Sequence, residues 1–215
     1  MFFPYKDDNP RILVPYLTYG IIGLNILIFL FQVGLGQSNQ NLIRHFGLIP
    51  AHWSLISLFT SMFLHGGFAH LLGNMWFLWL FGDNVESALG HVRYLIFYFL
   101  CGIGAAVAQT TINLDSTIPM VGASGAISGV LAAYMLQYPK ARVHVFMFLF
   151  IFFTTFRVPA FVVIGFWFLE QLTNGLGSIG LDISGGVAWF AHIGGFIAGA
   201  GLLKLNPLIR VEKYE

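Results

Sequence analysis

Seven long apolar runs dominate this sequence, and they constrain its fold more than any other feature. They lie at residues 14–34, 71–85, 92–111, 125–138, 143–156, 158–172 and 187–203. A helix of about 20 apolar residues can cross the hydrocarbon core of a bilayer. With 57% hydrophobic and only 9% charged residues, the chain lacks the polar surface of a soluble domain. We therefore expect one polytopic membrane domain over residues 1–215. The net charge of +1 also argues against a nucleic-acid partner.

The run at 143–156 is not expected to span the bilayer, because apolar runs this short are more often interfacial or buried. Counting the other six as spans places nine of the ten basic residues on one face and Arg44 on the other. The nine are Lys6, Arg11, Arg93, Lys140, Arg142, Arg157, Lys204, Arg210 and Lys213. Because basic residues concentrate on the cytoplasmic side, both termini are expected there. The predicted fold is an all-α bundle of six transmembrane helices, in a multi-pass protein of a prokaryotic plasma membrane.

Two connections on the outer side stand out. The first, residues 35–70, is long and contains an apolar stretch at 55–63 that is too short to span. We expect this stretch to lie in the outer leaflet. The last outer connection, residues 173–186, is rich in glycine, which permits tight turns and movement. It is either a plain flexible linker or a moving cap.

Four polar residues within the predicted spans are candidates for function, since polar groups are costly in lipid. They are His70, Asn74, Ser124 and His192. Each alone has an ordinary explanation, because serines often bond to their own helix and other polar groups join helices. Counted from the charged inner ends of their spans, however, all four lie at about 18–24 Å. This shared depth indicates a water-filled pocket open to the outside.

The chemistry that fits these residues is nucleophilic catalysis. Ser124 lies in Gly122-Ala123-Ser124-Gly125 at the start of a predicted helix, and a serine needs a base to activate it. His192 lies on another helix rich in small residues, which permit close approach. Because no carboxylate is assigned to orient the histidine, we predict a Ser–His dyad. His70, Asn74 and the Ser124 N–H would stabilise an oxyanion. Metalloprotease and phosphate-loop motifs are missing, so neither a metal nor a cofactor is expected.

These motifs resemble those of the rhomboid family of intramembrane serine proteases over about residues 46–205. The matching segments are FGLIP at 46–50, HGGFAHLLGN at 65–74, Val85-Glu86 with Gly90 and Arg93, GASG at 122–125 with Gly129, and Ala191-His192 with Gly195 and Gly199. The resemblance implies that Ser124 is the nucleophile, His192 the general base, and His70 and Asn74 oxyanion-hole side chains. It also implies a membrane-embedded first loop, a cap at 173–186 and a structural role for Glu86. The fifth span, with Phe161, Phe166, Trp167 and Phe168, would be a substrate gate.

Two positions depart from the family pattern. Some members carry a tyrosine four residues after the serine, stacked under the histidine, whereas this chain has Ser128. The orientation of His192 must then come from elsewhere. Some members also have an arginine two residues after the glutamate of the second span, whereas this chain has Ala88. The salt bridge expected at the inner end is therefore in doubt.

The sequence thus predicts an intramembrane serine endopeptidase that cleaves single-span membrane proteins near the outer side of the bilayer. Its partners would be transmembrane substrates and membrane lipid. One alternative is a non-catalytic rhomboid-like protein that binds membrane clients, although such relatives typically lack the serine or the histidine. A small channel or transporter is a third hypothesis. It would require polar residues that continue to the inner face, and the facing helices there are mostly apolar.

Overall fold

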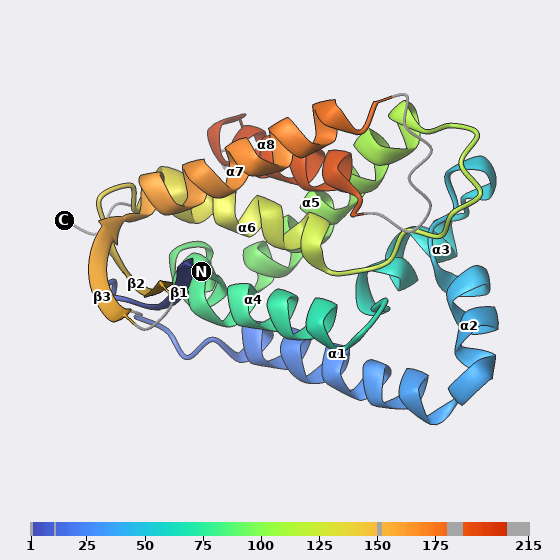
Figure 1. The fold of residues 1–215 in the computed structure, drawn as a ribbon, viewed down its shortest axis with the longest axis horizontal. Coiled ribbons are helices and arrows are strands. Elements are labelled where there is room, and N and C mark those ends of the chain that lie inside the picture. The colour runs from blue at the N-terminus through green and yellow to red at the C-terminus, as the bar shows by residue number, and fades with distance from the viewer. Residues whose placement is uncertain (1, 11, 150–151, 180–186, 206–215) are drawn as a thin grey trace.

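The computed structural model describes residues 2–10, 12–149, 152–179 and 187–205. Six long helices match the six predicted spans, so the helical character of these runs is confirmed. They are α1 (Tyr16–Gly34), α4 (Phe68–Leu89), α5 (His91–Ile112), α6 (Ser124–Gln137), α7 (Ala160–Gly177) and α8 (Trp189–Leu205). In Figure 1, α6 lies in the middle of the bundle, between α4 and the pair α7 and α8. It is also the most enclosed helix, with every residue from Gly125 to Tyr134 buried.

The protein is a multi-pass membrane protein. Within the described residues, α1 and α5 are long and apolar enough to cross a bilayer alone. Residues 55–63 and α4 pass the same criterion only as a pair bent by 87°, which is either a broken span or a re-entrant loop. No other described helix meets this criterion of length and hydropathy by itself. α6, for example, has 14 residues, which corresponds to only about 21 Å. The count of six spans therefore stays a prediction.

The expectation of an all-α fold was wrong, because one end of the bundle carries a three-stranded antiparallel sheet. Its strands are β1 (Phe2–Asp7), β2 (Arg142–Leu149) and β3 (Phe152–Pro159), in the order β1-β2-β3. The apolar run at 143–156 forms most of the β2–β3 hairpin. Along β2, Val143 and Val145 are buried while His144 between them is partly exposed. This alternation suits a sheet with one covered face.

The long loop between α1 and α4 folds into short helices, which the sequence analysis did not predict. These are η1 (Gly36–Ser38), α2 (Asn39–Phe46), η2 (Pro50–His52), α3 (Leu55–Thr60) and η3 (Ser61–Phe63). A capping box between Ser54 and Ser57 begins α3. Leu48 forms an isolated antiparallel bridge with Met120, which ties this loop to the segment that precedes Ser124.

Glycines and alanines bring α5, α6 and α8 into backbone contact. A Cβ on Gly195 of α8 would overlap the carbonyl oxygen of Gly125 on α6, and one on Gly199 would lie 2.5 Å from the Gly129 oxygen. On α5, Ala105 would meet a Cβ on Gly125 at 2.5 Å. Small residues at membrane helix interfaces allow such close approach. The interface therefore fixes how deeply α8 sits against α6.

Glu86 links α4 to the start of α1. Its buried carboxylate accepts hydrogen bonds from the backbone N–H of Leu17 at 3.0 Å and of Thr18 at 2.7 Å, and from the Thr18 hydroxyl at 2.7 Å. His91 Nδ1 lies 2.6 Å from the same carboxylate. An acidic group at a helix N-terminus satisfies N–H groups that have no partner within the helix. Glu86 therefore has partners in this chain although position 88 is Ala88 and not arginine.

Candidate active site

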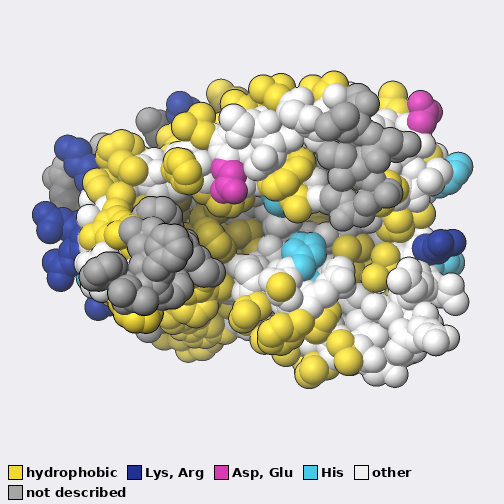
Figure 2. Space-filling view, in the orientation of Figure 1, with side chains coloured by type: hydrophobic (Ala, Val, Ile, Leu, Met, Phe, Trp, Pro, Cys, Tyr) yellow, Lys and Arg dark blue, Asp and Glu magenta, His cyan; other side chains and the backbone are white. Residues whose placement is uncertain are grey.

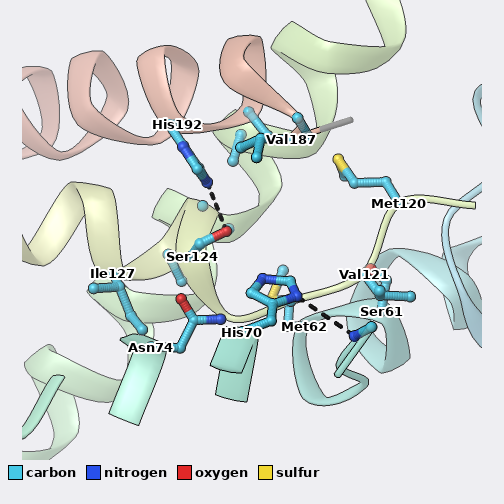
Figure 3. A pocket seen from close by; sticks show the side chains of 18 of the residues that line it. Ser61, Met62, His70, Asn74, Met120, Val121, Ser124, Ile127, Val187 and His192 are labelled. Carbon is cyan, nitrogen blue, oxygen red and sulfur yellow. Dashed lines mark hydrogen bonds between the residues drawn. The ribbon is translucent and has the colours of Figure 1, made fainter. Parts of the chain in front are cut away.

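All four candidate residues line one cavity of about 870 Å³. His70 and Asn74 come from α4, Ser124 from the first position of α6, and His192 from the first turn of α8. Their side chains converge in Figure 3, with Ser124 between His192 and the two α4 residues. A cavity of this size lies within the range of small-molecule and peptide sites. The structure thus brings together residues that lie up to 122 positions apart in the sequence.

Ser124 occupies the N-terminus of α6. Its backbone N–H belongs to the first turn, which lacks intrahelical acceptors and carries the positive end of the helix dipole. Gly122 precedes it with φ of 127°, a backbone conformation that favours glycine. The Gly122 N–H donates to the Ser61 carbonyl at 2.9 Å. This bond holds the segment before α6 against the loop between α1 and α4.

The Ser124 hydroxyl contacts the imidazole of His192. The distance from Ser124 Oγ to His192 Nε2 is 2.8 Å, which is within reach of direct proton transfer. His192 is buried with 9% exposure. Figure 3 shows the two side chains pointing toward each other across the gap between α6 and α8. A serine and an imidazole at this distance can act as nucleophile and base.

His70 lies on the opposite side of Ser124. Its Nδ1 accepts a weak hydrogen bond from the Gly66 N–H at 3.4 Å, so in the neutral ring the proton resides on Nε2. A Cβ added to Gly122 would lie 2.7 Å from this Nε2. The N–H of His70 therefore faces the backbone just before Ser124.

Comparisons with known proteins identify the family of this chain. The family model of the rhomboid domain matches residues 52–205. The chain belongs to the rhomboid family. It is 34% identical over 87% of its length to the rhomboid protease GluP of Bacillus subtilis, of which it covers 35%. It is 28% identical over 92% of its length to the mitochondrial rhomboid protein 1 of Saccharomyces cerevisiae, of which it covers 54%. The chain thus spans about a third to a half of these relatives.

Asn74 has a neighbour in this rhomboid that the sequence analysis did not assign. Asn74 Nδ2 lies 3.0 Å from Nε2 of the buried His65. The His65 backbone is held in turn by Gln32 of α1, which donates to the His65 carbonyl at 3.1 Å and accepts from its N–H at 3.0 Å. One N–H of the Asn74 amide is directed to His65, and the same nitrogen also lies near Gly122. Asn74 also lines the cavity.

The partner that replaces the family's stacking tyrosine comes from α7. Ser128 does not reach His192, because its hydroxyl donates to the Ser124 carbonyl at 2.7 Å. Gln171 on α7 instead places its Oε1 2.7 Å from His192 Nδ1. The ring of Trp167 lies 5.9 Å from the imidazole, one turn earlier on α7. The sequence analysis missed Gln171, although a glutamine within an apolar span is the same kind of signal that singled out Asn74.

The residues suggested as a gate have different surroundings along α7. Trp167 lines the cavity, and Phe168 stacks on Phe196 of α8 with ring centroids 4.2 Å apart. Phe161 and Phe166 are largely exposed and face away from the core. The expected cap at 173–186 begins as helix, because α7 continues to Gly177. Its residues 180–186 lie outside the described residues.

Proposed function

We propose that this rhomboid is an intramembrane serine endopeptidase that uses a Ser124–His192 dyad. The observation that carries the proposal is the 2.8 Å contact between Ser124 Oγ and His192 Nε2 at the cavity that also holds His70 and Asn74. The named rhomboid protease of Bacillus subtilis, at 34% identity, supports the same reaction class. No metal or cofactor is required by this chemistry.

In the proposed reaction His192 takes the Ser124 proton while Oγ attacks the carbonyl carbon of a peptide bond. The carbonyl oxygen then becomes an oxyanion. It would accept hydrogen bonds from His70 Nε2, Asn74 Nδ2 and the Ser124 N–H, and all three residues line the cavity. Collapse of this intermediate expels the amine, which receives the proton from His192. Water then hydrolyses the acyl-enzyme by the same steps, and Ser124 is regenerated.

The proposed substrate is a single-span membrane protein that is cut near the outer side of the bilayer. Helix-destabilising segments with small residues would be preferred, because an intact helix keeps its carbonyls hydrogen-bonded. Lys and Arg side chains cluster at the end of the molecule that carries the sheet (Figure 2). Lys6 lies on β1, Arg157 on β3, and Lys140 two residues before β2. This distribution supports a cytoplasmic location for that end. The cavity would then open toward the outside of a prokaryotic plasma membrane.

Cleavage of a model transmembrane substrate in liposomes tests the proposal. We expect the wild type to cut it and Ser124→Ala to be inactive, with Ser128→Ala as a matched control that leaves the dyad intact. Undiminished cleavage by Ser124→Ala would refute the mechanism. A fluorophosphonate that fails to label Ser124 in an intact wild-type protein would favour the client-binding alternative. Substrate-independent solute flux through proteoliposomes would favour a channel.

A further inference from the structure

We propose that Gln171 is a positioning residue for catalysis, which fixes the tautomer and the direction of the His192 ring. This inference rests on the proposed function and deepens it. It addresses how a rhomboid with Ser128 in place of the stacking tyrosine keeps its base aligned. Gln171 is buried, with 4% exposure, and faces His192 from α7.

The orientation of the Gln171 amide follows from its second hydrogen bond. Gln171 Nε2 donates to the Trp167 carbonyl at 3.2 Å, and a carbonyl oxygen can only accept. The amide nitrogen must therefore point back along α7. The amide oxygen, Oε1, is left facing His192 Nδ1 at 2.7 Å. The glutamine thus presents an acceptor, and not a donor, to the imidazole.

An acceptor at this position determines where the imidazole carries its proton. In a neutral histidine one ring nitrogen donates and the other accepts. Because Oε1 can only accept, Nδ1 carries the proton and Nε2 presents its lone pair to Ser124 Oγ, 2.8 Å away. The opposite tautomer would place two lone pairs against each other at Nδ1 and a proton between Nε2 and Oγ. It could not accept the serine proton.

With Gln171, the residues of the proposed site come from three different helices. Ser124 belongs to α6, His192 to α8 and Gln171 to α7. Trp167, on the same helix as Gln171, lies beside the imidazole, and Trp189 meets the ring edge-on at 6.3 Å. The base is therefore aligned only while α7 packs against α8. The neutral amide replaces the carboxylate that orients the histidine in a triad.

Two substitutions test whether Gln171 acts through its acceptor oxygen or only through the packing of its side chain. Gln171→Met keeps the length of the side chain but removes the amide oxygen, whereas Gln171→Glu keeps an acceptor for Nδ1. Thr173→Val is a matched control on the same helix, since the exposed Thr173 hydroxyl bonds only to backbone carbonyls of α7 in the described structure. We expect Gln171→Met to lower kcat about tenfold with little change in KM, because one hydrogen bond shifts a tautomer equilibrium by about that factor. Gln171→Glu should restore kcat to within about threefold of the wild type.

The ¹⁵N spectrum of labelled histidine gives a reading that does not depend on proteolysis. In the wild type, His192 is expected to show a protonated Nδ1 and an unprotonated Nε2, and Gln171→Met should show both tautomers. An unprotonated Nδ1 in the wild type would overturn the proposal. Equal loss of kcat in the Met and Glu variants, or an unchanged kcat in Gln171→Met, would do the same. If Ser124→Ala still cleaves substrate, the protease proposal fails, but the tautomer assignment is still decided by the spectrum.

Discussion

Adding a single methyl group at Gly195 should separate Ser124 from His192, the two residues of the proposed dyad, without altering either of them. A Cβ at this position would overlap the Gly125 carbonyl oxygen and lie 2.9 Å from its carbon. Carbon atoms in contact settle at about 3.5–4.0 Å, so Gly195→Ala must move α8 away from α6 by about 1 Å. His192 lies three residues earlier, on the same face of α8.

A displacement of this size is large enough to break the contact between Ser124 and His192. Ser124 Oγ and His192 Nε2 are 2.8 Å apart, and a displacement of about 1 Å would take them beyond hydrogen-bond range. A misplacement of this size costs about 100-fold in rate. Overpacking should also lower the free energy of unfolding by about 1–3 kcal/mol. Because folded proteins are stable by about 5–15 kcal/mol, most molecules should stay folded while the activity falls about 100-fold.

The assay compares cleavage of a reporter substrate in liposomes with thermal unfolding of the same preparations. Gly201→Ala is the matched control on α8, because a Cβ there would meet no atom within 4 Å. Gly199→Ala, whose Cβ would lie 2.5 Å from the Gly129 oxygen, is two turns from His192 and should lose less activity than Gly195→Ala. A folded Gly195→Ala protein that cleaves at the wild-type rate would refute the reasoning. An equal loss in Gly201→Ala would refute it as well.

Three further predictions concern other parts of the molecule. Asn74→Ala should lower kcat by about 100-fold with a small change in KM, since an oxyanion donor acts mainly in the transition state; steady-state cleavage kinetics would contradict this if only KM rose. Glu86→Ala should lower the free energy of unfolding by about 2 kcal/mol, because two N–H groups at the start of α1 lose their acceptor, and an unchanged Tm would exclude this role. Burial raises the pKa of Asp7 on β1 from 3.8 to about 6, against a hydrogen bond from Tyr134 that lowers it. The stability contributed by the neutral carboxyl is thus present below pH 3.8 and is lost as pH rises through about 6. Asp7→Asn should remove this decline in a pH series of unfolding measurements, and an identical pH profile in both proteins would contradict the assignment.

The positions of the long helices could be predicted from the sequence because lipid leaves the backbone few choices. A segment in the hydrocarbon core must satisfy its own N–H and C=O groups, which favours a helix wherever the apolar run is long. The predicted run at 92–111 and α5 (His91–Ile112) differ by one residue at each end. The prediction was less accurate for α7, which extends to Gly177 beyond the predicted end at 172. Glycines near a helix end permit a turn but do not require one.

The sheet could not be predicted, because its first strand has no local signal. β1 pairs with β2 across about 140 positions, for example Phe3 with Phe146 and Asp7 with Val143. Its sequence, FFPYKD, contains a proline and two charged residues and shows no alternation of apolar and polar positions. A strand of this kind is stabilised by its partners. The N-terminal segment is a strand only because the β2–β3 hairpin lies beside it.

The sequence by itself determined which residues would share the cavity. The depth of a polar group in a membrane helix follows from its distance to the charged end, and this placed His70, Asn74, Ser124 and His192 in one layer. Which of their neighbours would face them depends on how each helix is rotated about its axis, and packing decides that rotation. The contact of Gly195 with Gly125 brings the histidine to the serine. The packing of α7 directs Gln171 toward the imidazole. The sequence of α7 alone does not show which of its sides faces inward, so the tertiary structure decided this contact.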